Sequence, residues 1–288
     1  MHFHLPASIN EILWALTFAA HLVLLVVLMG RDRMRRFPWF TAYIALIAFR
    51  LLTAKMLYGR LAQIPMAAFF IGLALLSALI NVGMLLELAR KGFAGIRRVA
   101  WVAGALLMMA IGAAVLATWG PWPAWNEIKA PGLVSHLQLL QLIALKAGLF
   151  LDVETVLLGL AIVLFGGRFH AGWKTHIQRI MIGLSTISLS QLAVEAITDI
   201  LARTQPHSMA EYQHFMDLRD RIFYANSAVG VLVLIWWIAC LWKNEPGNEA
   251  GNEAGAKPKT ESGADKSMPA AVLPADATAP DQAPEDQA

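Results

Sequence analysis

Seven long apolar blocks occupy most of the first 242 residues, and they constrain the fold more than any other feature of the sequence. They lie near residues 10–30, 37–58, 65–89, 99–119, 136–166, 178–202 and 221–242. Each is close to the roughly 20 residues that a helix needs to cross a hydrocarbon core about 30 Å thick. A helix also satisfies its own backbone hydrogen bonds, which lipid cannot do. The sequence therefore predicts an all-α, polytopic membrane bundle of seven transmembrane helices within residues 1–242.

Positive charge between the blocks predicts the orientation of the bundle. The first, third and fifth connections carry most of it: Arg31, Arg33, Arg35 and Arg36; Arg90, Lys91, Arg97 and Arg98; Arg168, Lys174 and Arg179. The sixth connection is also charged, but its arginines are accompanied by acidic residues. Because cytoplasmic loops are enriched in Lys and Arg, we expect the N-terminus outside and the C-terminus in the cytoplasm. This predicts a multi-pass protein of the cytoplasmic (inner) membrane.

Residues 243–288 have a different composition from the rest of the chain. They hold four Lys and nine Asp or Glu, a net charge of −5, and they repeat Asn-Glu-Ala-Gly. Such a segment buries too little apolar surface to offset chain entropy, so we expect a disordered cytoplasmic tail without an effector domain. The sequence pI of about 9.1 therefore reflects short basic loops, which argues against a nucleic-acid partner.

Two carboxylates lie inside the fifth apolar block. Asp152 and Glu154 are two residues apart, which places them about 200° apart around a helix, on different faces. Asp152 shares a face with small and polar residues, a pattern typical of contacts between membrane helices: Gln138, Gln141, Gly148, Thr155 and Gly159. Both faces are buried against protein only if this helix is central in the bundle.

The sixth block carries a polar line, and the second carries an arginine at a similar depth. Ser188, Gln191, Glu195 and Asp199 recur at helical spacing on one face. Lipid penalises an Asp at the centre of a helix by about 2.5–3.5 kcal/mol, so this line should face the protein interior or water. Arg50 lies about 20 Å above the inner end of the second block at about 1.5 Å per residue. We therefore expect Arg50 to be the counter-ion of Asp152 or Glu195.

Several other classes of protein lack support in the sequence. His21 has no second histidine at its depth, and no Ser/His/Asp set or tight H-x-x-x-H pair suggests a hydrolase, so we expect neither an enzyme nor a metal or cofactor site. The seventh block has no lysine deep inside it for a retinal Schiff base. Prolines fall only at block ends or in loops, and no internal repeat suggests a transporter.

The connections outside the blocks carry a few local signals. Trp122 and Trp125 are placed for an outer aromatic belt. Ser208 and Glu211 form a capping-box pattern, which predicts a short outer helix that leads toward the seventh span.

The stretch "RRFPWFTAY", residues 35–43, resembles the inner end of the second helix in uncharacterised bacterial seven-helix inner-membrane proteins. The layout of residues 10–242 is also similar to the seven-helix sensor regions that precede bacterial kinases and cyclases. This chain departs from the sensor pattern because no kinase or cyclase follows its last span. If it signals, the resemblance implies that it does so through a partner.

The polar residues and the layout together favour a receptor or sensor-like protein. In this interpretation a small ligand binds in an intramembrane polar pocket in the outer half, with Arg50 pairing an anion and Asp152, Gln191, Glu195 and Asp199 supplying acceptors and hydrogen bonds. An ion- or proton-coupled carrier and a structural subunit of a membrane complex are the alternatives, and a purely structural ion-pair network is as well supported as a pocket. The expected partners are the lipid bilayer, a small-molecule ligand, and a cytoplasmic or membrane protein.

Overall fold

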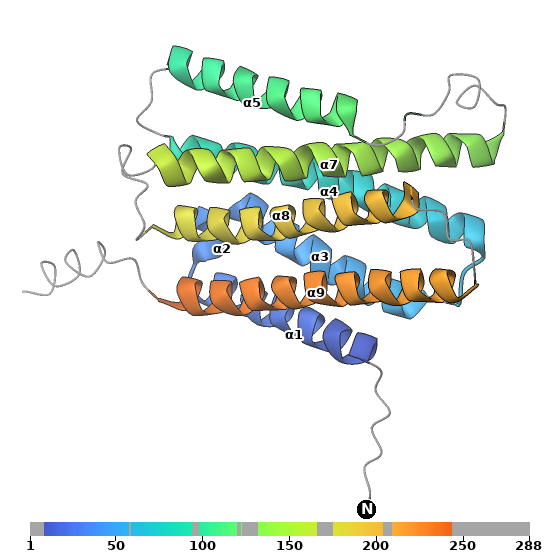
Figure 1. Cartoon of the computed structure of the whole chain (residues 1–288). Helices are drawn as coiled ribbons and strands as arrows, with labels where there is room; N and C mark the ends of the chain where they lie inside the picture. The colour runs from blue at the N-terminus through green and yellow to red at the C-terminus, as the bar shows by residue number, and fades with distance from the viewer. Residues whose placement is uncertain are drawn as a thin grey trace, which may run out of the picture. The chain divides into compact units, whose positions relative to one another are not determined.

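The computed structural model describes residues 9–57, 59–93, 98–119, 122, 132–165, 175–203 and 209–243. Within these residues the chain forms eight helices (Figure 1): α1 (Ile9–Gly30), α2 (Arg33–Arg36), α3 (Pro38–Leu57), α4 (Gln63–Gly92), α5 (Arg98–Thr118), α7 (Leu133–Phe165), α8 (His176–Arg203) and α9 (Met209–Trp242). All except α2 are long and apolar enough to cross a membrane. The protein is therefore an all-α, multi-pass membrane protein with seven candidate spans.

Six of the spans pack as a closed ring. In order of contact, α1 packs on α3, α3 on α4, α4 on α7, α7 on α8, α8 on α9, and α9 returns to α1. Helix α5 lies outside this ring against α7 (Figure 1). Of its apolar window only 6% is buried, whereas α7 has 44%, the largest share of any span. The fifth span is thus the most buried of the seven, which meets the condition for covering both of its carboxylate-bearing faces with protein.

The ends of the spans follow from local backbone chemistry. Pro38 is the first residue of α3 and Pro65 lies in the first turn of α4, where the backbone N–H has no partner within the helix. Between α1 and α2, Asp32 adopts a left-handed conformation with φ 52°, which Asp tolerates better than most residues. This turn reverses the chain and lets the short helix α2 lead directly into α3.

One end of the bundle holds the apolar core. We call it the basic end because the described residues Arg33, Lys91 and Arg179 lie there, at ends of α2, α4 and α8. Leu24, Phe40, Leu88, Ile162 and Leu241 are all completely buried in this core. Lipid supplies no hydrophobic drive between helices, so close packing has to hold them together. Small residues permit it, because the side chain of Ser185 occupies the space that a Cβ at Gly159 would fill.

Helix α9 differs from the sequence-based prediction. We expected a short outer helix followed by the span 221–242, but residues 209–242 form one continuous helix of 34 residues. The charged residues of its first half prolong the helix beyond the apolar segment instead of ending it, since Glu, Asp and Arg are compatible with helix when exposed. The predicted cap Ser208, the loop residue Trp125 and the predicted tail 243–288 after Lys243 lie outside the described residues.

Candidate functional site

The polar side chains that the sequence singled out meet where α7, α8 and α9 pack together. Ser188 on α8 donates a hydrogen bond to Oδ1 of Asp152 on α7, with 2.7 Å between the oxygens. Asp152 is half-buried and Ser188 is buried. A hydroxyl bound to a carboxylate is a charge-assisted hydrogen bond, which is stronger than a neutral one. The polar face of α7 and the polar line of α8 therefore contact each other, as their spacing predicted.

A second link joins α8 to α9. Ser190 donates to Oδ1 of Asn226 at 2.7 Å, and the Asn226 amide nitrogen donates to Oε1 of Gln191 at 3.0 Å. One asparagine therefore satisfies two neighbouring polar residues of α8 at once. Asn226 was not among the site residues predicted from the sequence.

Glu195 and Asp199 continue this line toward the end of α8 that is away from the basic end, and both are half-buried. Glu195 lies within electrostatic range of both Asp152 and Lys146. Lys146 is buried, and its Nζ donates to the backbone oxygen of Trp119 at 2.6 Å and stands 4.6 Å from the ring centroid of Trp122. We had predicted Arg50 as the counter-ion of these carboxylates. In the structure the cation within electrostatic range of Glu195 is Lys146, which lies on the same helix as Asp152.

Arg50 does not form the ion pair that its depth predicted. It is exposed, and no ion pair within 4.0 Å joins it to Asp152 or Glu195 in the described part of the chain. The phenol of Tyr43, about two helical turns before Arg50 on α3, lies within electrostatic range of both Arg50 and Asp152. Counting residues gives the depth of a side chain in the membrane, but it does not say which side of the helix faces the rest of the bundle. This explains why Arg50 does not pair as predicted. Tyr43 was detectable, because it precedes Arg50 by seven residues and so shares its face.

We call the group Tyr43, Asp152, Ser188, Ser190, Gln191, Glu195 and Asn226 the polar cluster. Of the five predicted site residues, Asp152, Gln191 and Glu195 belong to it. Asp199 lies one turn beyond Glu195, and Arg50 is within electrostatic range of Tyr43. The cluster combines two carboxylates with hydroxyl and amide groups, and it lies near two cations. Chemically it can accept hydrogen bonds from a ligand and hold a small charged group.

Glu154 lies apart from this cluster, on the opposite face of α7. Its side chain is buried against α5 at Gly112, where a Cβ would meet Glu154 and the ring of Phe150. Its Oε1 is buried without a hydrogen-bond partner among the residues that the structure describes. The prediction that the two carboxylates occupy separate, protein-covered faces is confirmed.

A further polar group at the basic end explains the "RRFPWFTAY" stretch. The backbone N–H of Trp39, in the first turn of α3, donates to Oε2 of Glu87 on α4 at 3.0 Å. Lys91 donates to Oε1 of Glu87 at 2.6 Å and also to the backbone oxygen of Arg36. Glu87 thus satisfies a first-turn N–H that has no partner within α3. Sequence reasoning gave Glu87 no role, since only the folded chain brings the two helix ends together.

The indole of Trp39 also lies directly on α4. A Cβ at Gly83 would stand 2.5 Å from its Cε3 atom, so α3 reaches this position only because residue 83 is glycine. The motif therefore fixes how α3 enters the bundle.

Neither metal chemistry nor known relatives add to this description. No group of three or more His, Cys, Asp and Glu side chains is placed to hold a metal ion in the described ranges. His21 is buried, and its Nδ1 lies 2.7 Å from the backbone oxygen of Thr17 on its own helix. Comparison of the chain with models of known families, with curated proteins and with solved structures gave no match.

Proposed function

We propose that this protein is a seven-helix receptor or sensor-like protein of the cytoplasmic membrane, with its N-terminus outside, that binds a small polar ligand at the polar cluster. One observation carries the proposal: hydrogen bonds between charged or polar side chains tie α7, α8 and α9 together inside otherwise apolar helices. Ionisable residues within a membrane are expensive and mark functional sites by default.

The burial of the cluster favours a ligand over a purely structural network. Asp152, Gln191, Glu195 and Asn226 are each only half-buried, although each is polar and lies within a membrane span. A side chain that serves only to hold helices together is more stable when fully enclosed and fully hydrogen-bonded. A ligand with a donor or cationic group for the carboxylates and an anionic group for Arg50 would complete the cluster.

The helix that the ligand would move is α9. It runs without interruption from Met209 to Trp242, and Asn226 ties its middle to the polar cluster. At the basic end its last carbonyls accept hydrogen bonds from Arg179 and Arg33. A ligand that binds more tightly to one packing of α9 than to another shifts the population between them. This would carry a signal to the cytoplasmic side, where a protein partner would receive it.

An ion- or proton-coupled carrier is the second candidate, because Asp152 and Glu195 are two carboxylates that interact electrostatically. A carrier also needs a polar path to the other side. Between the cluster and the basic end, most of the interface of α7 and α8 is apolar, with side chains that are at most 4% exposed: Leu158, Ile162, Ile180, Met181 and Leu184. The one described serine in this stretch of α8, Ser185, donates its hydroxyl to the backbone oxygen of Thr155. This apolar layer favours the receptor over the carrier.

The test is a thermal-shift screen of the purified full chain against small amines, carboxylates and amino acids. A ligand at 100 times its Kd stabilises by about 2.7 kcal/mol, which a melting curve resolves. Asp152→Asn and Asn226→Leu should abolish the shift given by a hit. Glu154→Gln is the matched control, because it neutralises a buried carboxylate on the same helix outside the cluster.

Two results would decide against the receptor. If no compound shifts the wild-type protein, and Asp152→Asn only lowers its stability, the cluster is structural. If a hit also crosses vesicle membranes that contain the reconstituted protein, and Asp152→Asn stops that flux, the carrier is correct.

A further inference from the structure

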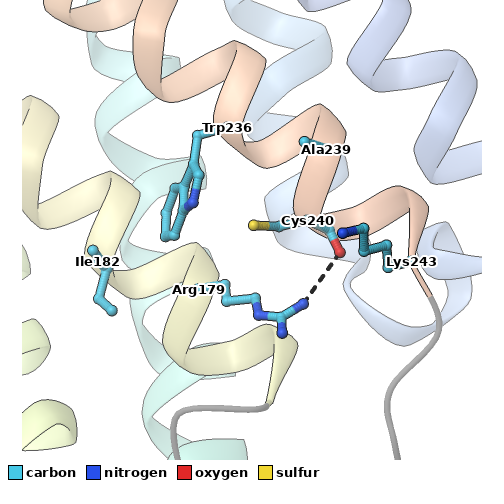
Figure 2. A pocket seen from close by; sticks show the side chains of 6 residues that line it. All are labelled: Arg179, Ile182, Trp236, Ala239, Cys240 and Lys243. Atoms are coloured by element: carbon cyan, nitrogen blue, oxygen red, sulfur yellow. Dashed lines mark hydrogen bonds between the residues drawn. The ribbon is translucent and has the colours of Figure 1, made fainter.

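A pocket of about 320 Å³ opens between α8 and α9 at the basic end. Figure 2 shows the six side chains that line it: Arg179, Ile182, Trp236, Ala239, Cys240 and Lys243. It is far along the chain from the polar cluster on both helices, since more than one helical turn separates Ile182 from Ser188 and Trp236 from Asn226. The proposed ligand site does not use any of these six residues.

The charge of the pocket is positive. Its two basic residues are Arg179 and Lys243, and none of its described lining residues is an aspartate or glutamate. Arg179 donates from Nη1 to the backbone oxygen of Cys240 at 3.4 Å, which occupies one of the five N–H donors of a guanidinium. The ammonium of Lys243 forms no hydrogen bond or ion pair with the described part of the chain. Both cationic groups are thus available to an anion.

The rest of the pocket is apolar and borders the lipid-facing surface. Figure 2 shows the indole of Trp236 and the side chain of Ile182 on the side away from Lys243. The neighbouring residues Ile235 and Trp242 are more than half exposed. Trp and Lys or Arg together are typical of the depth where lipid headgroups lie. A ligand that suits this pocket has an anionic head next to an apolar chain.

We propose that this pocket binds the phosphate of an anionic glycerophospholipid, with the acyl chains running along α8 and α9. Planar guanidinium and flexible ammonium groups are the side chains that bind phosphate oxygens. Basic pockets between membrane helices on the cytoplasmic side bind anionic headgroups in this way. Free phosphate would meet the same two cations but would leave Trp236 and Ile182 without a partner, so the lipid is the ligand that matches both halves of the pocket.

The test is native mass spectrometry of the full chain in a neutral detergent, titrated separately with phosphatidylglycerol, phosphatidylcholine and inorganic phosphate. We expect phosphatidylglycerol to be retained preferentially. Lys243→Gln and Arg179→Gln should each weaken its binding about fivefold, because each removes one cation near the headgroup. Ala239→Phe fills the pocket without changing charge and should weaken binding as well.

Controls separate the pocket from general attraction to the basic end. Arg35→Gln removes one exposed positive charge from the connection between α1 and α3 and should leave binding unchanged, since Arg35 is 87% exposed and lies outside the pocket. Because Arg179 also holds the end of α9, its variant is checked for an unchanged melting temperature, whereas Lys243→Gln breaks no contact in the structure. Equal losses from Arg35→Gln and Lys243→Gln would overturn the proposal. So would retention of phosphatidylcholine or inorganic phosphate as strong as that of phosphatidylglycerol.

Discussion

Replacing Glu87 with alanine should destabilise the bundle more than any other change of a single charge at the basic end. The side chain of Glu87 is 6% exposed, and its two oxygens accept from Trp39 N–H at 3.0 Å and from Lys91 Nζ at 2.6 Å. Hydrogen bonds to charged groups contribute about 1.5–3 kcal/mol each. Lys91 is 35% exposed, so solvent screening reduces the contribution of its bond with Glu87. In the variant Lys91 also retains its hydrogen bond to the backbone oxygen of Arg36.

The expected loss for Glu87→Ala is therefore about 2–4 kcal/mol, most of it from the unsatisfied N–H of Trp39. Glu87→Gln keeps an acceptor for that N–H and should cost about 1 kcal/mol. The assay is reversible unfolding of the purified full chain in mixed micelles, followed by circular dichroism. Asp32→Asn is the matched control, because its ion pair with Arg35 is 3.6 Å long and mostly exposed, and such pairs contribute about 0–1 kcal/mol.

A double-mutant cycle with Lys91→Met separates the ion pair of Glu87 and Lys91 from the hydrogen bond of Glu87 with the Trp39 N–H. We expect a coupling energy of about 1 kcal/mol between Glu87 and Lys91. The reasoning is refuted if Glu87→Ala costs no more than Asp32→Asn, or if Glu87→Gln and Glu87→Ala are equally harmful, because the acceptor for Trp39 would then be irrelevant.

Four further substitutions test how the helices pack. Gly183→Ala should lower the free energy of unfolding by about 1–3 kcal/mol, since its Cβ would stand 2.5 Å from Cε2 of Trp237. Gly230→Ala is its control: this glycine has open space around it, so the change should be neutral or slightly stabilising in the same melting assay. Glu154→Met should raise the melting temperature, because it replaces a buried oxygen that has no described partner with an apolar group of similar shape; a lower value would reveal a partner for that carboxylate. Asn226→Leu should cost about 1 kcal/mol, the scale of hydrogen bonds between membrane helices, and a loss below the error of the measurement would mean that its two bonds contribute nothing.

The sequence predicted the fold and part of the site. The seven spans and the contact between the polar faces of α7 and α8 are confirmed, because length and helical spacing determine both. The pairing of Arg50 was not predictable, since which way α3 faces depends on its neighbours. The role of Glu87 depends on a contact across 48 residues of sequence, which periodicity does not encode. Ligand binding, orientation and the tail remain predictions.

The ring of six spans has a consequence for the order in which the protein matures. Helix α1 packs on α9, so α1 finds one of its neighbours only after the whole stretch up to α9 has been made. Until then the side of α1 that packs on α9 lacks its partner, and the core to which α1 contributes Leu24 and Leu28, both completely buried in the finished protein, is incomplete. A chain that stops after α8 would keep that seam open and would lack the indole of Trp237 that packs edge-on against Phe40. An unfinished copy therefore differs from a complete one at α1 as well as at the missing helix.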